Sequence, residues 1–498
     1  SNGNEGRCLI DYSEKKTKKK TYKKNKSQYG TGRIMAIEIM EKLLNQSEIS
    51  IKDKIIDDDG SVHYEKNQPE TLLALEKARI LNEKFKTWIF DDFDRREEYT
   101  SYYNKTFNNM VLREYDGSNM VFPGMNPEFA LQPYQKNAVA RIVRGGSTLL
   151  GHCVGAGKSF EMIAAAMELK RLNLANKPLI IVPNGLVGQM AGEFLKLYPA
   201  AEVLVTTKKD FQKDNRRRFI SKIATGDYDA VIMGQSQFEK IPVSKERQKA
   251  YLENEVYEIL ECMEDLKRNN ADNWTVKMME REKKKLTSQI EDLKRDEYKD
   301  DVITFEELGV DALFIDEAHY YKNLSFSTKM TRVAGINPAG AKKCMDLFLK
   351  REFLYEKNPG RNLIFATGTP ISNTMCEMYT MMKYLEPDVL RDAKVYHFDA
   401  WAANFGETVT AMELTPEGNG YRQKTSFSHF TNLPELLKMF KRVADIVTPD
   451  MINIKIPKLV DDKYNIVESE PNADVKAYMK DMVHRADLVH AGSVNPQD

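Results

Sequence analysis

Apolar and polar positions follow two rhythms along this chain of 498 residues. Between residues 131 and 385, short apolar runs of strand length alternate with stretches whose apolar positions recur at helical spacing. This alternation predicts an α/β fold in which a parallel sheet is flanked by helices. The expected strands are 148–150, 179–183, 203–206, 230–233, 312–316 and 363–367.

A helical pattern precedes this region, and a second one interrupts it. Apolar residues recur at helical spacing from about 32 to 109, which predicts a helical N-terminal region, placed at 32–125. Residues 243–300 are densely charged, with one narrow apolar stripe at helical spacing. We expect a helical hairpin inserted between two strands. Its simplest role is a solvated excursion, with contact to a partner or to DNA as the alternative.

The chain has no net charge, but its charged residues are distributed unevenly along the sequence. The 74 basic residues equal the 74 acidic ones, so any contact with nucleic acid must come from local patches. Eight lysines crowd into residues 15–26 with almost no apolar residue between them, and such a run cannot fold alone. We expect a basic, disordered segment at 1–31. A salt-sensitive contact with a DNA backbone is the alternative.

Cysteine usage and hydropathy narrow the class of protein further. The 5 cysteines form no C-x-x-C pair, so neither a zinc cluster nor a disulfide framework is indicated. No apolar run approaches the roughly 18 residues needed to span a bilayer, and no secretion signal opens the chain. We therefore expect a cytoplasmic protein without a membrane partner.

The strongest local signal is the sequence His-Cys-Val-Gly-Ala-Gly-Lys-Ser at 152–159, directly after the expected strand 148–150 and before a helical run. Glycines let backbone amides approach phosphates, and the next helix presents its positive end. Lys158 would reach the outer phosphates, and Ser159 would hold magnesium. The strict pattern has glycine where His152 stands. A glycine-rich turn also arises by chance, so the assignment depends on the motifs that follow. The expected nucleotide-binding residues are Gly155, Ala156, Gly157, Lys158 and Ser159.

A second signal is an apolar strand, 312–316, that ends in two consecutive carboxylates. At this position Asp316 can hold magnesium, while Glu317 can orient and polarise the water that attacks the terminal phosphate. Adjacent acids could instead merely open a helix, but the upstream phosphate loop disfavours that reading. His319 is either a satisfied polar residue or a link from the nucleotide site to the next motif, and the second reading is favoured.

The third signal is Thr-Gly-Thr-Pro at 367–370, again directly after an apolar strand. Alone it reads as a tight turn. After the other two motifs it is the expected coupling element, because its hydroxyls can bond to the acidic motif and sense its state. The coupling residues would be Thr367, Gly368 and Thr369.

Together these motifs resemble the Swi/Snf-type branch of superfamily two, over roughly residues 129–470. Leu-Gln-Pro-Tyr-Gln at 131–135 is similar to the family's opening motif, in which Gln135 would read the adenine edge. Residues 179–189 and 229–236 resemble its first DNA-contacting motifs. The most specific likeness lies in Asp-Glu-Ala-His-Tyr-Tyr-Lys-Asn at 316–323 and Thr-Gly-Thr-Pro-Ile-Ser-Asn at 367–373.

The resemblance implies a RecA-like P-loop NTPase lobe at 126–388, the ATP-binding lobe of an ATP-dependent double-stranded DNA translocase or remodelling motor. Its cofactors would be ATP and Mg²⁺, and its partner would be duplex DNA, bound largely without sequence preference. The resemblance assigns catalysis to Lys158, Asp316, Glu317 and His319. It assigns DNA contact to Pro183, Asn184, Gln235 and Ser236.

A narrower likeness extends upstream. Residues 122–126 and 88–103 resemble large helicase and DNA-methyltransferase proteins of phages, plasmids and conjugative elements. No Asn-Pro-Pro-Tyr signature occurs, so a methyltransferase domain would lie elsewhere in a longer parent. No Q-x-x-G-R-x-x-R pattern follows Thr367, and residues 389–498 are expected to be a connector toward an absent second RecA-like lobe. We therefore expect an ATP hydrolase that is weak or inactive without that lobe's arginine.

Other functions stay open. A strand-separating helicase would need a wedge that the sequence does not identify. A module of another class would bind DNA or a partner and use the nucleotide as a switch, without efficient hydrolysis. A P-loop kinase is disfavoured because it explains neither Gln135 nor the Thr-Gly-Thr-Pro element.

Overall fold

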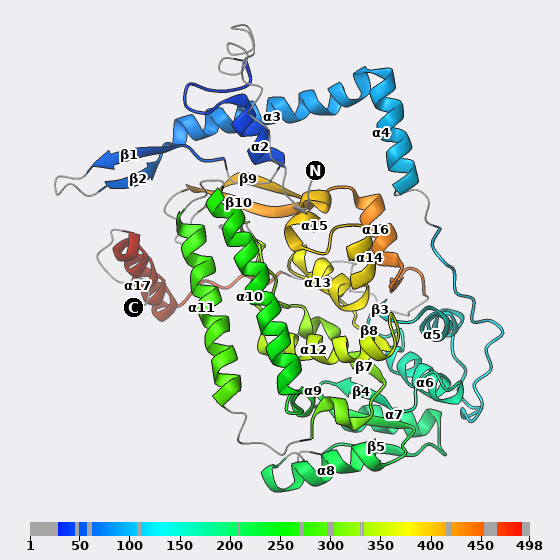
Figure 1. Ribbon diagram of the computed structural model, residues 1–498. Coiled ribbons are helices and arrows are strands. Elements are labelled where there is room, and N and C mark those ends of the chain that lie inside the picture. Colours follow the sequence, from blue (N-terminus) through cyan, green and yellow to red (C-terminus); the bar gives the residue numbers. More distant parts are fainter. Residues whose placement is uncertain are drawn as a thin grey trace.

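The structure is a computed structural model (Figure 1). It describes residues 28–44, 49–56, 62–106, 111–207, 209–210, 212–268, 273–295, 303–328, 330, 333–414, 421–452 and 466–490. The lysine-rich run at 15–26 and the segment 453–465, which belongs to the expected connector, lie outside these residues. No helix in the described part of the chain has the length and apolar character that crossing a membrane requires.

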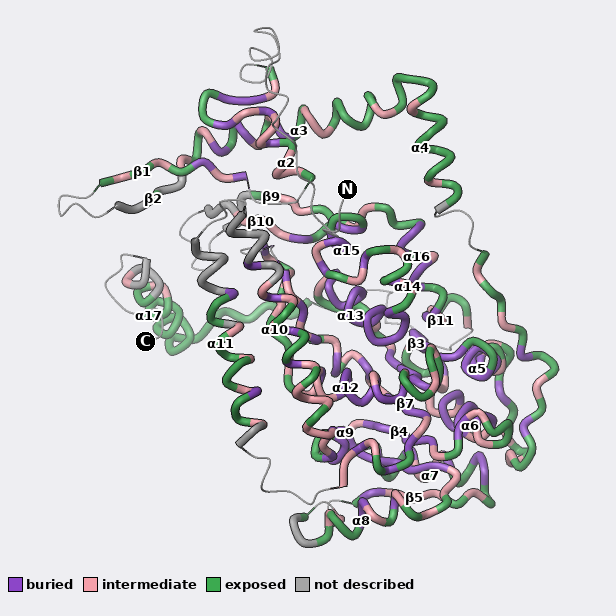
Figure 2. The backbone as a smooth tube through the Cα atoms, viewed as in Figure 1, coloured by how far each residue is buried: buried purple, intermediate pink, exposed green. Residues whose placement is uncertain are grey.

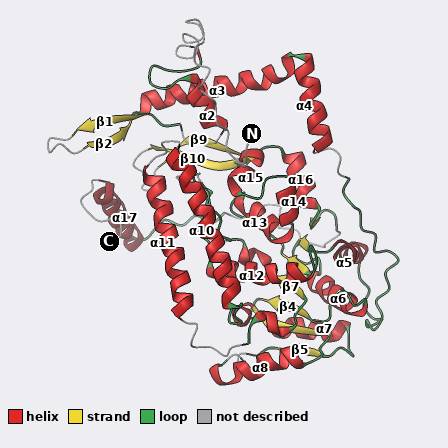
Figure 3. Cartoon of the chain, in the orientation of Figure 1, coloured by secondary structure: helices red, strands yellow, loops and turns green. Residues whose placement is uncertain are grey.

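The described strands of the central region form one parallel sheet, as the sequence predicts (Figure 3). The strand order is β11-β3-β8-β7-β4-β6-β5. Strands β3, β4 and β6 are buried along their whole length, as expected of a parallel sheet covered on both faces. The strands are β3 (Thr148–His152), β4 (Pro178–Val182), β5 (Val203–Val205), β6 (Ala230–Gly234), β7 (Ala312–Asp316), β8 (Leu363–Ala366) and β11 (Ala444–Val447).

The sheet divides the apolar core into two layers. Successive strand residues point to opposite faces, so Leu150 and Phe314 join one layer while Leu149 and Leu313 join the other. The first layer packs against α5 (Pro133–Gly145), α6 (Lys158–Arg171) and α7 (Val187–Leu197). The second packs against α8 (Lys213–Thr225), α9 (Gln235–Phe238), η3 (Phe305–Leu308), η4 (Ala318–Tyr321), α12 (Lys342–Lys357) and α13 (Cys376–Leu385).

The core continues beyond residue 388, where the sequence predicts that the RecA-like lobe ends. Strand β11 pairs with β3, with Ala444 opposite Leu149 and Val447 opposite His152. Trp401 is fully buried in the same core as the central sheet. The expected boundary therefore cuts through one sheet and one core. The added elements are α14 (Pro387–Asp392), α15 (Phe398–Phe405), β9 (Gly406–Leu414), β10 (Tyr421–Phe430), α16 (Leu433–Lys441) and β11.

The expected helical hairpin is confirmed between β6 and β7. It consists of α10 (Lys245–Arg268) and α11 (Asn273–Arg295), which enclose a small apolar cluster of their own. Arg247 of α10 makes two hydrogen bonds of 2.7 Å to the carboxylate of Glu356 on α12. The hairpin is thus fixed to the helical layer at its base.

The N-terminal region is helical, as expected, but it also contains an unexpected strand pair. Helix α2 (Ala36–Leu44) packs on α3 (Gln68–Asp91), which leads into α4 (Phe93–Thr106). Between α2 and α3, β1 (Lys52–Ile56) pairs antiparallel with β2 (Val62–Lys66). Figure 2 shows that α3 and α4 project from the body with largely exposed surfaces. At the other end of the chain, α17 (Ala473–His490) is also largely exposed.

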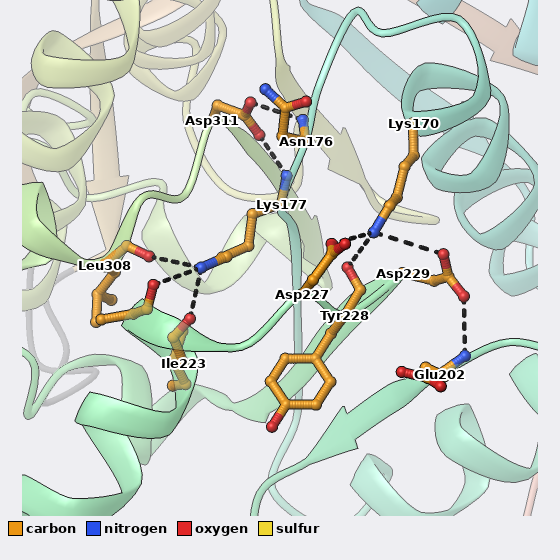
Figure 4. Close-up of polar contacts among 11 residues, drawn as sticks. Lys170, Asn176, Lys177, Glu202, Ile223, Asp227, Tyr228, Asp229, Leu308 and Asp311 are labelled. Carbon is orange, nitrogen blue, oxygen red and sulfur yellow. Dashed lines mark hydrogen bonds and ion pairs between the residues drawn. The ribbon is translucent and has the colours of Figure 1, made fainter.

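Polar contacts close the amino edge of the sheet (Figure 4). The ammonium of Lys177, just before β4, donates to the carbonyls of Ile223, Ala224 and Leu308 at 2.6, 2.9 and 3.3 Å. These bonds satisfy carbonyls at the end of α8 and in η3 that lack partners within their helices. The carboxylate of Asp311 accepts from the backbone amides of Asn176 and Lys177. Nearby, Lys170 binds Asp227, Asp229 and the carbonyl of Tyr228.

Candidate nucleotide and nucleic-acid site

The three nucleotide motifs follow three neighbouring strands. The phosphate loop follows β3, the Thr-Gly-Thr-Pro turn follows β8, and the acidic motif ends β7. Ala366 of β8 lies opposite Leu150 on one side and Asp316 on the other. Because these strands are parallel, their carboxyl ends meet at one edge, where ligands of open α/β sheets bind. The structure therefore brings the expected catalytic and coupling residues together.

The phosphate loop has the backbone that its glycines allow. Gly155 and Gly157 lie in the left-handed region, with φ of 88° and 83°. The left-handed backbone favours glycine at 157, and a Cβ atom there would come within 2.4 Å of the side-chain nitrogen of Gln135 and displace it. The ammonium of Lys158 donates to the carbonyls of His152 and Cys153 at 2.9 and 3.3 Å, so it lies over the loop. Ser159 is in the first turn of α6, whose amino end faces the loop.

Gln135 contacts the loop directly. Its side-chain amide donates to the carbonyl of Ala156 at 2.9 Å, and its side-chain oxygen accepts from the backbone amide of Gln132 at 2.8 Å. The hydroxyl of Tyr134 donates to the same Ala156 carbonyl at 2.8 Å. Gln135 thus binds the phosphate loop and the start of α5 in this structure. Reading an adenine edge, as the resemblance implies, would use its remaining amide hydrogen or break one of these bonds.

The acidic motif combines burial with negative charge. Burial and the neighbouring charge of Glu317 raise the pKa of Asp316 to about 6, against a weaker lowering effect of Lys158. One Asp316 oxygen accepts from the Glu317 amide at 3.0 Å. Glu317 has a left-handed backbone, with φ of 51°. Two carboxylates in tight succession beside a cation are typical of a site that binds a metal and a phosphate.

A hydrogen-bond relay joins this motif to the next. Nδ1 of His319 lies 3.0 Å from the hydroxyl of Thr367 and 3.1 Å from a carboxylate oxygen of Glu317. The Thr367 hydroxyl accepts from the amide of Thr369, and the Thr367 amide donates to the carbonyl of Leu150 on β3. Thr367 therefore bonds to strand β3, which leads into the phosphate loop, and to the acidic motif, and a coupling role would use these two contacts.

The residues expected to contact DNA follow β4 and β6, which are neighbours in the sheet. The side-chain oxygen of Asn184 accepts from the amide and hydroxyl of Ser236 at 3.1 and 2.9 Å, and both residues are exposed. Pro183 is half-buried. Gln235 is only 7% exposed, and its amide points to the carbonyl of Asp316 at 3.5 Å. Asn184 and Ser236 thus form an exposed polar pair, whereas Gln235 faces the acidic motif.

Comparison with known families decides the class of this chain. The family model described as "Probable helicase domain" matches residues 141–448. The chain belongs to this helicase-domain family. The match includes the three nucleotide motifs and ends just after β11, so it follows the sheet rather than the boundary at 388. A second model, a domain of unknown function named DUF8437, matches residues 10–109.

A curated relative and two solved structures are similar to this helicase domain. "Defense against restriction protein B" of Escherichia phage P1 is 23% identical over 436 residues, which are 77% of this chain and 19% of that protein. The chain thus spans about a fifth of that relative's length. The family match confirms the expected likeness to helicases, and the curated relative confirms a likeness to a phage protein.

The two structures are SWI2/SNF2 ATPase cores from Sulfolobus solfataricus. The one in complex with dsDNA is 18% identical and covers 58% of this chain and 40% of its own, with a TM-score of 0.31. The other is 16% identical and covers 69% of this chain and 50% of its own, with a TM-score of 0.34.

One buried group in the helicase domain was not expected from the sequence. His152, where the strict phosphate-loop pattern has glycine, is fully buried. Its Nδ1 lies 2.9 Å from a carboxylate oxygen of Glu161 on α6, and its Nε2 lies 3.4 Å from a carboxylate oxygen of Asp445 on β11. Burial opposes protonation of His152, but the ion-pair contact with Asp445 and the hydrogen bond to Glu161, together with the negative charge of both carboxylates, outweigh it and raise the pKa to about 9. The only hint of this buried group in the sequence was that histidine stands at 152 in place of the glycine of the strict phosphate-loop pattern.

Proposed function

We propose that this helicase domain is the ATP-binding lobe of an ATP-dependent double-stranded DNA translocase or remodelling motor. The observation that carries the proposal is the position of Thr367, which bonds to strand β3 through the carbonyl of Leu150 and to the acidic motif through the ring of His319. A site that only bound nucleotide would not need this relay. A motor does, because hydrolysis must be transmitted to another surface.

The residues present suit Mg²⁺ and ATP. Left-handed glycines open the loop to phosphate oxygens, and α6 directs its amino end at them. The Ser159 hydroxyl and the Asp316 carboxylate are the hard oxygen donors that Mg²⁺ prefers. Bound Mg²⁺ would neutralise charge on the phosphates. Lys158 would leave the carbonyls of His152 and Cys153 to bind the outer phosphates, and Glu317 would orient the attacking water.

The track would be duplex DNA, held through its phosphates. Asn184 and Ser236 present an amide and a hydroxyl at the same edge of the sheet as the nucleotide site. Such groups suit phosphate oxygens and carry no base specificity. A second RecA-like lobe of a larger, phage-related protein would supply the arginine that speeds phosphoryl transfer, by about 10³ to 10⁵. A methyltransferase domain of that protein would act separately.

The first test is binding of a fluorescent ATP analogue with Mg²⁺, with and without duplex DNA. Lys158→Ala should weaken binding by about 10- to 150-fold, the worth of a charge-assisted hydrogen bond. Lys222→Ala, at an exposed position on α8, is the matched control and should bind as the wild type does. Equal affinity of wild type and Lys158→Ala would refute the phosphate-loop assignment.

Turnover separates the proposed motor from the alternatives. Glu317→Gln should bind ATP normally but abolish any hydrolysis, including that measured with the second lobe present. Unaltered turnover in this variant would remove Glu317 from the mechanism. Nucleotide binding without turnover in the two-lobe protein would favour a nucleotide-switched DNA-binding module. Strand displacement by that protein would favour a helicase, and movement along intact duplex would favour a translocase.

A further inference from the structure

The Thr-Gly-Thr-Pro turn continues into a loop whose far end is held by a buried ion pair. The ammonium of Lys322, which follows η4, lies 2.9 Å from a carboxylate oxygen of Glu377 and 2.7 Å from the hydroxyl of Ser372. The two charged side chains are only 16% and 4% exposed. They join the segment after the acidic motif to the first turn of α13.

Glu377 shapes the loop as well as binding the lysine. Its carboxylate accepts from the backbone amides of Ser372 at 2.7 Å and Asn373 at 3.2 Å. Burial opposes its charge, but these hydrogen bonds and Lys322 outweigh burial and lower the pKa of Glu377. The hydroxyl of Thr380 donates to the carbonyl of Lys322 at 2.8 Å, which holds the lysine backbone against α13.

The loop is therefore fixed to the acidic segment at both ends. At its start, Thr367 bonds to His319. At its end, Ser372 and Glu377 bond to Lys322. Residues 371–373 between these points are exposed. A displacement of the segment that carries Glu317 must move the loop, because both anchors lie on that segment.

A stabilising role alone explains this pair poorly. Buried ion pairs contribute little net stability, since desolvation offsets most of the attraction. Fixing one geometry between two moving parts is a role that such a pair serves well. The amides bound by Glu377 also belong to the exposed part of the loop rather than to the core.

We propose that Lys322 and Glu377 are positioning residues that couple the nucleotide site to nucleic-acid binding by moving the exposed loop 371–373 with the acidic motif. This proposal rests on the proposed function. Coupling of two binding sites is reciprocal, so the pair determines how strongly DNA changes nucleotide affinity as well as the reverse.

The experiment measures the dissociation constant of fluorescent Mg-ATP analogue with and without saturating duplex DNA, and takes their ratio. The wild type should show a ratio of about 5 to 150, the usual range of such coupling. Glu377→Gln removes the charge but keeps an acceptor for the loop amides, and Lys322→Met removes the cation. Both should bring the ratio close to 1, with the DNA-free constant within about twofold of wild type.

Two further variants separate positioning from folding. Lys322→Arg keeps the cation and should retain most of the ratio, whereas Ser372→Ala removes one hydroxyl from an exposed position and should lower it part-way. If Lys322→Met or Glu377→Gln unfolds, the Ser372→Ala result decides. The proposal is overturned if Ser372→Ala and either charge variant keep the wild-type ratio of the two nucleotide dissociation constants. It is also overturned if a charge variant loses the same factor of nucleotide affinity with and without DNA.

Measurements on the wild type distinguish failure of the coupling proposal from failure of the proposed function. If it binds both nucleotide and DNA with a ratio of 1, the coupling proposal is overturned while the proposed function stands. If it binds no nucleotide or no DNA, the proposed function fails and the coupling proposal falls with it.

Discussion

The buried His152 gives the sharpest stability prediction for this helicase domain. We consider His152→Gln, which keeps a polar side chain but removes the positive charge between Glu161 and Asp445. A pKa raised from 6.5 to about 9 corresponds to roughly 3 kcal/mol of folding free energy, at about 1.4 kcal/mol for each tenfold change. The variant should lose most of this amount at pH 7, because the buried carboxylate of Glu161, whose pKa burial already raises, loses the cation that it contacts.

The pH dependence follows from the direction of the shift. Because the folded protein holds the proton more tightly than the unfolded chain, this stabilisation is complete below pH 6.5. It is lost as the pH rises through about 9. The difference in unfolding free energy between wild type and His152→Gln should therefore be roughly 2 to 3 kcal/mol at pH 7 and less than about 1 kcal/mol at pH 9.

Urea unfolding at the two pH values measures this difference. His484→Gln, at an exposed position on α17, is the matched control and should match the wild type at both. Asp445→Asn should cost less than Glu161→Gln, because the Asp445 side chain is 27% exposed and the Glu161 side chain is fully buried. A difference that is the same at pH 7 and pH 9, or absent at pH 7, would refute the buried charged histidine.

Three shorter predictions test other parts of the structure. Lys177→Met should lower the unfolding free energy by about 1 to 3 kcal/mol, because it leaves three carbonyls at the amino edge without their donor, while the nucleotide dissociation constant stays unchanged. Gly157→Ala should weaken nucleotide binding, measured by titration, because a Cβ is strained at a φ of 83° and displaces the Gln135 amide that bonds to the loop; wild-type affinity would contradict the loop geometry. Mg²⁺-dependent nucleotide binding should weaken as the pH falls below about 6, where Asp316 becomes protonated, and Asp316→Asn should remove the part of that dependence that Asp316 causes.

The sheet was predictable where strands are long apolar runs and was missed where they are not. Five of its strands are buried apolar runs and the sixth, β5, is a short half-buried apolar run, so their apolar residues alone located them. In strand β11, Asp445 interrupts the apolar residues, so the strand offers no apolar run to find. Its place in the sheet comes from tertiary contacts. The amide of Leu149 donates to Val443, and the amide of Cys153 donates to Val447. The β1–β2 pair escaped for a similar reason, since its strands are rich in lysine.

The candidate site also has a part that the sequence predicts and a part that only the structure shows. Each nucleotide motif is contiguous in the sequence, and its residue types carry its chemistry, so Lys158, Asp316 and Thr367 could be identified without coordinates. Partners that are distant in the sequence could not be. Nothing local pairs Lys322 with Glu377, and nothing local shows that Gln235 turns toward Asp316 rather than outward.

The contacts found only in the structure leave the nucleotide site in two directions. On one side, His152 and the Cys153 amide tie the phosphate loop to β11. On the other, His319 and Lys322 tie the acidic motif to the loop at 371–373. The first connection fixes the loop proposed to hold the phosphates, so its loss should change nucleotide affinity and stability together. The second lies beyond the phosphates, so its loss should leave affinity intact and remove only the response to DNA. A lobe that only bound nucleotide would need the first connection alone, so the second connection is the one that favours the proposed motor over a nucleotide-binding module.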